Sequence, residues 1–191
     1  RREKVGHSMA IDHFLTLSRH RQHNLLSEWL SLRGIGGGGH RVIAEVIDTL
    51  IPARSDGNPR VVLRGGEFRR FQGRLYLLPS QTEGPFPAQI AISDSLPAAL
   101  PDGAVLQPCH SRGSRALALQ PGDRLALGFR RGGERCCPAG RPGSSSLKKL
   151  LNEYGVEPWL RDRIPLIFVN GELAAVADLF VCREYCCGSD E

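Results

Sequence analysis

Residues 146–176 read SLKKLLNEYGVEPWLRDRIPLIFVNGELAAV, and this stretch decides the fold of the second half of the chain. Its first part has apolar residues at helical spacing after Ser146, a residue type that favours the N-cap position. These apolar residues are Leu147, Leu150 and Leu151. Gly155 is typical of a helix end, so we predict a helix from near Ser146 to Gly155.

The rest of the stretch has the pattern of a β-hairpin. Residues 165–169 and 173–176 are two apolar runs, and Asn170-Gly171 between them is the dipeptide most typical of a two-residue hairpin turn. Residues 158–160 begin with a proline and predict a short helical turn before the hairpin. A helix followed by a hairpin indicates a small α+β domain.

Upstream of this stretch the pattern changes to strands with the period-two alternation of β-structure, followed by a glycine-rich loop. Residues 115–119 and 124–129 alternate as strands around the turn 120–123. Residues 130–143 then form a glycine-rich basic loop that leads into the predicted helix.

The first half of the chain has helical spacing before residue 52 and short strands after it. Ser18 is a predicted N-cap between two helical segments, Gly34 ends the second, and a third stops at Pro52 after the flexible joint 36–39. The apolar residues of these helices are Ile11, Phe14, Leu15, Leu25, Leu26, Trp29, Leu30, Val42, Ile43, Val46, Ile47 and Leu50. Glycine turns separate the predicted strands 61–63, 67–71 and 75–78.

These patterns predict an α+β fold in two parts. A helical cluster with a small β-hairpin or meander occupies residues 1–79, and a separate small α+β domain occupies residues 114–184. Residues 80–113 are rich in proline, serine and small residues, with weak strands near residues 90–92 and 104–106, and we interpret them as a connector.

Composition narrows the class of protein. The 191 residues carry 25 Lys and Arg against 20 Asp and Glu, a formal net charge of +5, which favours an anionic partner such as nucleic acid. No apolar run approaches the ~18 residues of a membrane span, so we expect a soluble cytoplasmic protein without a membrane partner. The chain begins at Arg1 and its single methionine is Met9, so we expect a piece of a longer polypeptide.

Two blocks of the chain resemble one family. The string 146–176 is similar to the C-terminal domain of tRNA(Ile)-lysidine synthetases. An upstream block resembles the substrate-binding middle domain of the same family. That block comprises Ala53-Arg54, Asp56, Pro59, Glu67-Phe68-Arg69-Arg70-Phe71 and Leu75-Tyr76. The two blocks stand in the order that the family has.

The resemblance implies a ligase activity in the full-length enzyme. In that family, ATP and Mg²⁺ support adenylylation of the wobble cytidine of isoleucine tRNA, which the ε-amine of lysine then attacks. The chemistry belongs to an N-terminal domain with a Ser-Gly-Gly-x-Asp-Ser loop, and that string is absent from these 191 residues. The glycine run 36–39 leads into a predicted helix but has no partner Lys, so we interpret it as a linker rather than a phosphate loop. We therefore expect no cofactor in this chain and a catalytic domain elsewhere in the same polypeptide.

The basic loop and the helix start are the first candidate tRNA contacts. Their cations are Arg135, Arg141, Lys148 and Lys149. A basic glycine-rich loop before a helix N-terminus offers both side-chain charge and free backbone N–H groups to phosphate, and the family grips the acceptor-stem side of tRNA here. The alternative is a solvated charged face around the helix core. Cys137 and Ser145 stand near positions that are basic in the family, which implies a weaker grip or compensation elsewhere.

A second candidate cluster comprises Arg69, Arg70 and Arg74, with Phe68 and Phe71 interleaved. Because side chains alternate along a strand, Arg69 and Arg70 should point to opposite faces unless a bulge intervenes. At least one of them is a candidate for tRNA contact, and the alternative is surface salt bridging.

Trp159 and the residues after it are kept out of the candidate site. A tryptophan in a short amphipathic turn is more often a core anchor than a base-stacking platform. Arg161 and Arg163 are expected to be exposed, with Asp162 as the ion-pair partner of one of them.

The cysteines and histidines predict neither a metal site nor a catalytic site. Zinc ligands are usually two to four residues apart on two knuckles, and the adjacent pair Cys136-Cys137 fits poorly with Cys182, Cys186 and His110. We favour incidental reduced thiols over a zinc site. The histidines are scattered, and no carboxylate or serine stands at a spacing typical of a catalytic pair.

The leading hypothesis is therefore the tRNA-binding portion of a tRNA(Ile)-lysidine synthetase, which positions isoleucine tRNA and is inactive alone. The alternative is a stand-alone, non-enzymatic RNA-binding accessory protein. The oligomeric state does not follow from the sequence.

Overall fold

The chain forms two compact units, Arg1–Glu83 and Gly84–Glu191. The computed structural model describes residues 8–36, 38–54, 58–80, 89–92, 97–100, 103, 105–107 and 116–187. Asp56, His110 and most of the predicted connector 80–113 lie outside the described residues. Within the described part of the chain, no helix combines the length and apolar character that crossing a membrane requires.

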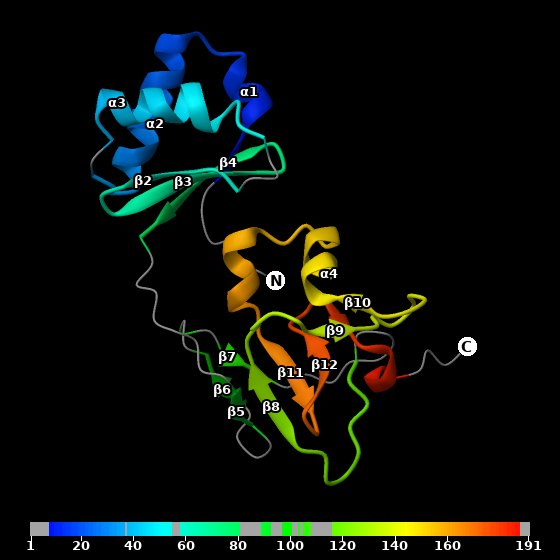
Figure 1. Ribbon diagram of the computed structural model, residues 1–191. Helices are drawn as coiled ribbons and strands as arrows, with labels where there is room; N and C mark the ends of the chain where they lie inside the picture. The colour runs from blue at the N-terminus through cyan, green and yellow to red at the C-terminus, as the bar shows by residue number, and fades with distance from the viewer. Residues whose placement is uncertain are drawn as a thin grey trace. The chain divides into compact units, whose positions relative to one another are not determined.

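In the first unit, helices cover one face of a four-stranded antiparallel sheet of order β1-β4-β3-β2 (Figure 1). Its helices are α1 (Ile11–Leu15), α2 (Arg19–Leu32) and α3 (His40–Glu45), which continues into the π-helical turn η1 (Val46–Leu50). Its strands are β1 (Ser8–Ala10), β2 (Arg60–Leu63), β3 (Gly66–Phe71) and β4 (Arg74–Pro79). The three predicted helices and three predicted strands are confirmed, whereas β1 is too short to show a pattern in the sequence.

The core of the first unit lies between the helices and the inner face of the sheet. Its largest fully buried side chains are Leu26, Ile43, Leu50, Phe68, Leu75 and Leu77. Gly38 is part of this packing, because a Cβ added there would overlap the Cδ1 atom of Leu30. The glycine run that the sequence presents as a linker therefore allows α3 to approach α2 closely.

Two leucines predicted on the apolar helix faces are exposed instead, Leu15 by 56% and Leu25 by 40%. The inner face of α2 includes Gln22, which is buried. Its side-chain amide donates to the carbonyl oxygens of Phe14, at 3.2 Å, and Leu17, at 3.1 Å. Carbonyls at a helix end lack helical partners, so this glutamine joins the end of α1 to α2. Hydrophobic spacing alone could not identify a polar residue in that position.

In the second unit, a five-stranded antiparallel sheet of order β13-β12-β11-β8-β5 is the main element. Its strands are β5 (Gln89–Ala91), β8 (Leu125–Gly128), β11 (Leu166–Val169), β12 (Glu172–Val176) and β13 (Phe180–Val181). The shorter elements are β6 (Ala98–Ala99), β7 (Val105–Leu106), β9 (Arg135–Cys136), β10 (Ser145–Ser146), α4 (Leu147–Glu153) and the 3-10 turns η3 (Pro158–Arg163) and η4 (Arg183–Tyr185). The predicted α+β fold class is confirmed in both units.

The predicted hairpin is present as β11 and β12, and its turn residues Asn170 and Gly171 have φ values of 51° and 90°. These positive angles are those of the hairpin turn that Asn-Gly favours. The strand predicted at residues 115–119 is wrong: the described residues 116–119 form no strand. Instead, the N–H of Ala118 donates to the Tyr185 carbonyl at 2.8 Å. These backbone groups therefore form hydrogen bonds with the C-terminal segment rather than with β8.

Candidate nucleic-acid interface

The loop between β8 and α4 positions the first predicted cluster. Within it, β9 pairs with β10 in the register Ser145↔Cys136 and Ser146↔Arg135. Ser146 is the N-cap of α4, and its Oγ accepts a hydrogen bond from the backbone N–H of Lys149 at 3.4 Å. This short ladder therefore holds Arg135 beside the first turn of α4.

Arg141 and Lys149 meet at one carboxylate. Arg141 Nη1 forms an ion pair with Glu153 Oε2, and Lys149 Nζ lies 3.9 Å from Glu153 Oε1. The Arg141 Cζ atom also lies 5.5 Å from the centroid of the Tyr154 ring. The hydrogen bond between the two side chains lowers the pKa of Glu153 from its ordinary value and raises that of Arg141. Glu153 thus holds the Arg141 side chain, and Lys149 lies at the outer limit of ion-pair distance from the same carboxylate.

The other two predicted cations are exposed, as Lys149 is. Lys148 is exposed in the first turn of α4, whose opposite face is buried. Arg135 is exposed and donates to the Ser144 carbonyl at 3.2 Å. Arg135, Arg141, Lys148 and Lys149 are therefore brought together on one loop–helix substructure.

Three further arginines lie on or against this loop and were not predicted as site residues. Arg183, in η4, donates to the carbonyl oxygen of Arg141 from 42 residues away in the sequence. Arg130 and Arg131 begin the loop, and Arg131 is exposed. No sequence spacing links Arg183 to the loop, so only the fold reveals it.

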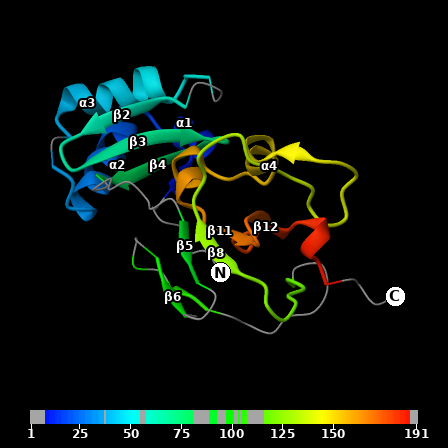
Figure 2. The same ribbon diagram turned by 60° about the horizontal axis from the view of Figure 1, so that its bottom comes forward.

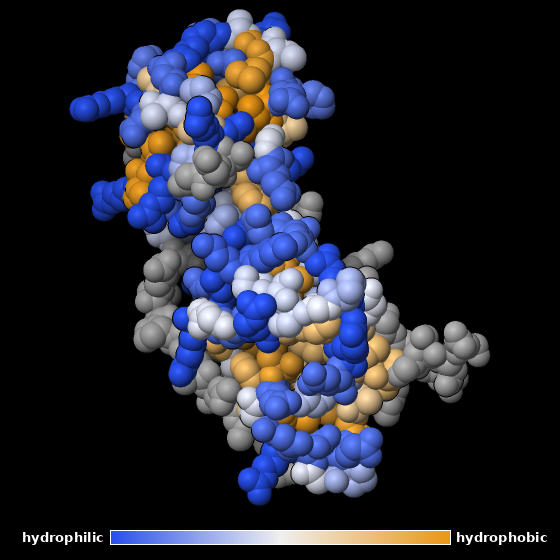
Figure 3. Space-filling view, turned by 45° about the vertical axis from the view of Figure 1, so that its right-hand side comes forward, coloured by the Kyte–Doolittle hydropathy of each residue, from blue (hydrophilic) through white to orange (hydrophobic). Residues whose placement is uncertain are grey.

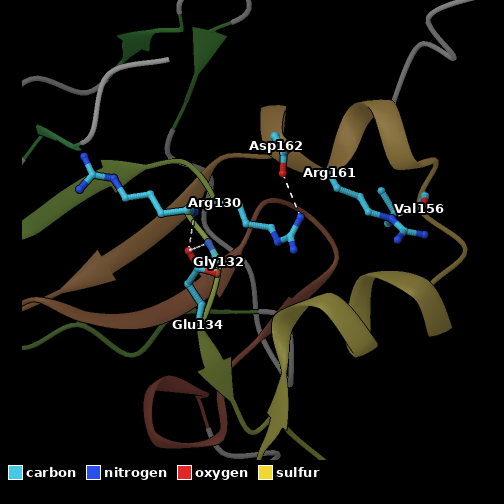
Figure 4. A network of polar contacts seen from close by, with 7 residues as sticks. Arg130, Gly132, Glu134, Val156, Arg161 and Asp162 are labelled. Atoms are coloured by element: carbon cyan, nitrogen blue, oxygen red, sulfur yellow. Dashed lines mark hydrogen bonds and ion pairs between the residues drawn. The ribbon is translucent and has the colours of Figure 1, made fainter. Parts of the chain in front are cut away.

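Asp162, expected to pair with Arg161 or Arg163, has a partner in the basic loop that the sequence did not indicate. Asp162 Oδ1 pairs with Arg130 Nη1 at 2.9 Å (Figure 4). Arg161 is half-buried rather than exposed, and its Nε donates to the carbonyl oxygen of Val156 at 2.9 Å. Burial and then the charge of Arg130 lower the pKa of Arg161. The segment after α4 therefore holds the Arg161 side chain, while Asp162 links η3 to the basic loop.

The second predicted cluster, in the first unit, consists of three separately held side chains. Arg69 Nε lies 2.6 Å from Glu67 Oε1, and its side chain is 11% exposed. Arg70 donates to the Ala53 carbonyl, and Arg74 donates to Ser8 Oγ at 3.0 Å. The register of β3 with β4 has no bulge, which confirms that Arg69 and Arg70 face opposite sides of the sheet. Their contact with RNA remains a prediction.

The cysteines of the second unit form a buried thiol pair. Cys136 and Cys182 are both buried, and the hydrogen bond between their thiols raises the pKa of Cys182. The five cysteines that the structure describes are free. Among the described residues, no three His, Cys, Asp or Glu side chains gather closely enough to hold a metal ion.

The visible surface of each unit is mostly hydrophilic, with smaller patches of hydrophobic residues between (Figure 3).

Figure 2 shows α4 in yellow and the loop that precedes it in yellow-green to yellow. In the run 36–39, Gly38 lies against the Leu30 side chain, whereas nothing lies within 4 Å of a Cβ built at Gly36 or Gly39.

Two family models match the chain. The TilS substrate binding domain matches residues 9–76, and the TilS substrate C-terminal domain matches residues 125–191. Curated relatives match across both regions. The tRNA(Ile)-lysidine synthase of Alkalilimnicola ehrlichii is 31% identical over 185 residues, which are 96% of this chain and 42% of the relative. That of Coxiella burnetii is 32% identical over 174 residues, 90% of this chain and 38% of the relative.

A third relative, the tRNA(Ile)-lysidine synthase of Methylococcus capsulatus, is 32% identical over 165 residues, 81% of this chain. The chain spans 36–42% of the length of these three relatives. The two matched domains follow each other in one order and correspond to the two compact units. The chain therefore belongs to the tRNA(Ile)-lysidine synthase family, of which it carries the substrate-binding domain and the C-terminal domain.

Proposed function

We propose that this chain is the tRNA-binding portion of a tRNA(Ile)-lysidine synthase and that it positions isoleucine tRNA for a catalytic domain elsewhere in the polypeptide. The observation that carries the proposal is the joining of Arg135, Arg141, Lys148 and Lys149 on one loop and helix start within the matched C-terminal domain. Cations held in this way bind backbone phosphates, which supply affinity without reading sequence. In the first unit, Arg69, Arg70 and Arg74 are proposed as secondary contacts.

The ligase reaction itself is assigned to the part of the enzyme that these residues do not include. ATP and Mg²⁺ would act there, and lysine would be joined to the wobble cytidine of the tRNA. The Ser-Gly-Gly-x-Asp-Ser loop expected for that chemistry is not among these 191 residues, so we assign no catalytic step to them. We place the enzyme in the cytoplasm, where its tRNA substrate is.

Fluorescence anisotropy with isoleucine tRNA across a salt series tests the proposal. We expect binding whose affinity falls steeply with salt, because phosphate contacts release counterions. Absent binding, or binding insensitive to salt, would refute the proposal. A stand-alone RNA-binding protein would also bind, so the second arm adds a separately expressed catalytic domain, ATP and labelled lysine. Incorporation that depends on this chain supports the ligase.

A further inference from the structure

The loop 130–134 holds an anion on its own backbone. The Glu134 carboxylate accepts hydrogen bonds from the N–H of Arg131, at 2.5 Å, and from the N–H of Gly132, at 3.0 and 3.1 Å (Figure 4). Gly132 and Gly133 have φ values of 97° and 91°, so the chain turns in a conformation that favours glycine. Successive N–H groups that converge in this way form a nest for a negatively charged group. In this structure the occupant of the nest is a side chain of the same loop.

The charge around the nest exceeds what its carboxylates neutralise. Residues 130–135 read RRGGER, which is three guanidinium groups and one carboxylate. Arg131 and Arg135 are exposed. The Arg130 side chain is 20% exposed and pairs through Nη1 with Asp162, which is 73% exposed. The Nε of Arg130 is buried and has no hydrogen-bond partner among the described residues.

Arg161 adds to this excess of positive charge. The charge of Arg130 contributes to the lowered pKa of Arg161, after burial as the larger cause, so the two guanidinium groups lie close enough to repel each other. Figure 4 shows Arg130 reaching the Asp162 carboxylate of η3, whereas the Arg161 side chain points toward Val156. The Asp162 charge offsets part of the repulsion, and a further anion beside Arg130 would offset more of it.

We propose that residues 130–134 form a phosphate site that Glu134 occupies in the absence of RNA. An RNA backbone phosphate replaces the Glu134 carboxylate on the N–H groups of Arg131 and Gly132, and the arginines of the loop neutralise its charge. This inference rests on the proposed function, since RNA is the source of the phosphate. Glu134 then competes with RNA, and its removal strengthens binding.

The test uses the whole 191-residue chain with three variants. Glu134→Ala empties the nest, and Glu134→Gln removes the charge but leaves an amide oxygen that still accepts the N–H bonds. Glu28→Gln is the matched control, because Glu28 is exposed on α2 and the change in net charge is the same. Glu134→Gln also controls for a change in loop conformation, because its amide oxygen can keep the hydrogen bonds that Glu134→Ala loses.

We expect Glu134→Ala to bind isoleucine tRNA about five- to tenfold more tightly at ~0.1 M salt, and to steepen the salt slope by about 0.7–0.9, the value of one phosphate contact. Glu134→Gln should be intermediate and Glu28→Gln close to the unaltered chain. Titration with inorganic phosphate should shift the Gly132 amide resonance of Glu134→Ala, and the shift should level off at high phosphate. The same resonance in the unaltered chain should not move.

The inference is overturned if Glu134→Ala binds tRNA no more tightly than Glu28→Gln, or if phosphate leaves the Gly132 amide unmoved in that variant. If the unaltered chain binds no tRNA, the proposed function fails instead. The phosphate titration then still reports on the nest, because it requires no RNA. The two failures are therefore distinguishable.

Discussion

Replacing Lys148 and Lys149 together by alanine separates an RNA contact from a structural role. Both lysines are exposed in the first turn of α4, and the buried face of that helix consists of other residues. Alanine favours helices at least as much as lysine does, so α4 should persist. The link from Lys149 to Glu153 spans 3.9 Å between exposed groups and contributes little to folding. The free energy of unfolding should therefore be unchanged while RNA binding weakens.

The size of the effect follows from the number of contacts. If each lysine neutralises one phosphate, the pair contributes about 1.8 to the slope of log K against log salt, at ~0.9 for each contact in a duplex. From about 50 to about 200 mM salt, the unaltered chain should then lose about tenfold more affinity than the double variant. Anisotropy with labelled isoleucine tRNA at four or more salt concentrations gives both slopes, and thermal unfolding verifies the fold.

Arg124→Ala is the control for net charge alone. Arg124 is exposed and precedes β8, whereas the basic loop follows that strand, so the two lie at opposite ends of it. Lys148→Ala and Arg124→Ala each remove one positive charge, and only the first should reduce the slope by about 0.9. An unchanged slope in the folded double variant would refute the reasoning and leave α4 with a solvated charged face. Equal losses in the two single variants would attribute binding to net charge.

Three further changes test other parts of the structure. Gly38→Ala should destabilise the first unit by about 1–3 kcal/mol in chemical denaturation, because the added Cβ would lie 2.2 Å from Leu30 Cδ1 and force that buried side chain to shift. Gly36→Ala meets no atom within 4 Å and should be nearly neutral. Burial and the hydrogen bond to Glu172 raise the pKa of Tyr185 to about 12. The neutral phenol therefore contributes fully to the stability of the folded state below the unfolded pKa of ~10, and this contribution is lost as pH rises through about 12. Ultraviolet titration should show this late ionisation, and Glu172→Gln should move it to lower pH; an unmoved titration contradicts the assignment. Arg183→Ala should weaken tRNA binding several-fold and reduce the salt slope, while Arg183→Lys should keep most of the slope; equal losses would show that charge is not its contribution.

The parts of the fold that depend on neighbouring residues could be predicted from the sequence. Ser146 precedes the start of α4 and Gly155 follows its end, as their residue types predict, and Asn170-Gly171 forms the turn of the hairpin. The opposite orientations of Arg69 and Arg70 follow from strand alternation alone. In each case the cause is a local preference of the backbone.

The parts that were missed depend on partners distant in the sequence. Arg130 pairs with Asp162 across 32 residues, and Arg183 reaches the Arg141 carbonyl across 42. The backbone of residues 116–119 finds its partners at the C-terminal end of the chain, so the predicted strand next to β8 does not form. Periodicity carries no information on such pairings, because contacts between distant segments, rather than local backbone preferences, determine them.

The arrangement around Arg141 offers a physical answer to the shortage of cations in the loop. Cys137 and Ser145 stand near positions that the family resemblance predicts to be basic, yet Arg183 arrives at the same loop from another element. Arg141 is also held in place by Glu153 and by the Tyr154 ring. A long side chain already held in one conformation loses less entropy on binding than a free one. We therefore expect a loop with fewer cations, held in this way, to lose less affinity for RNA than the number of its charges alone predicts.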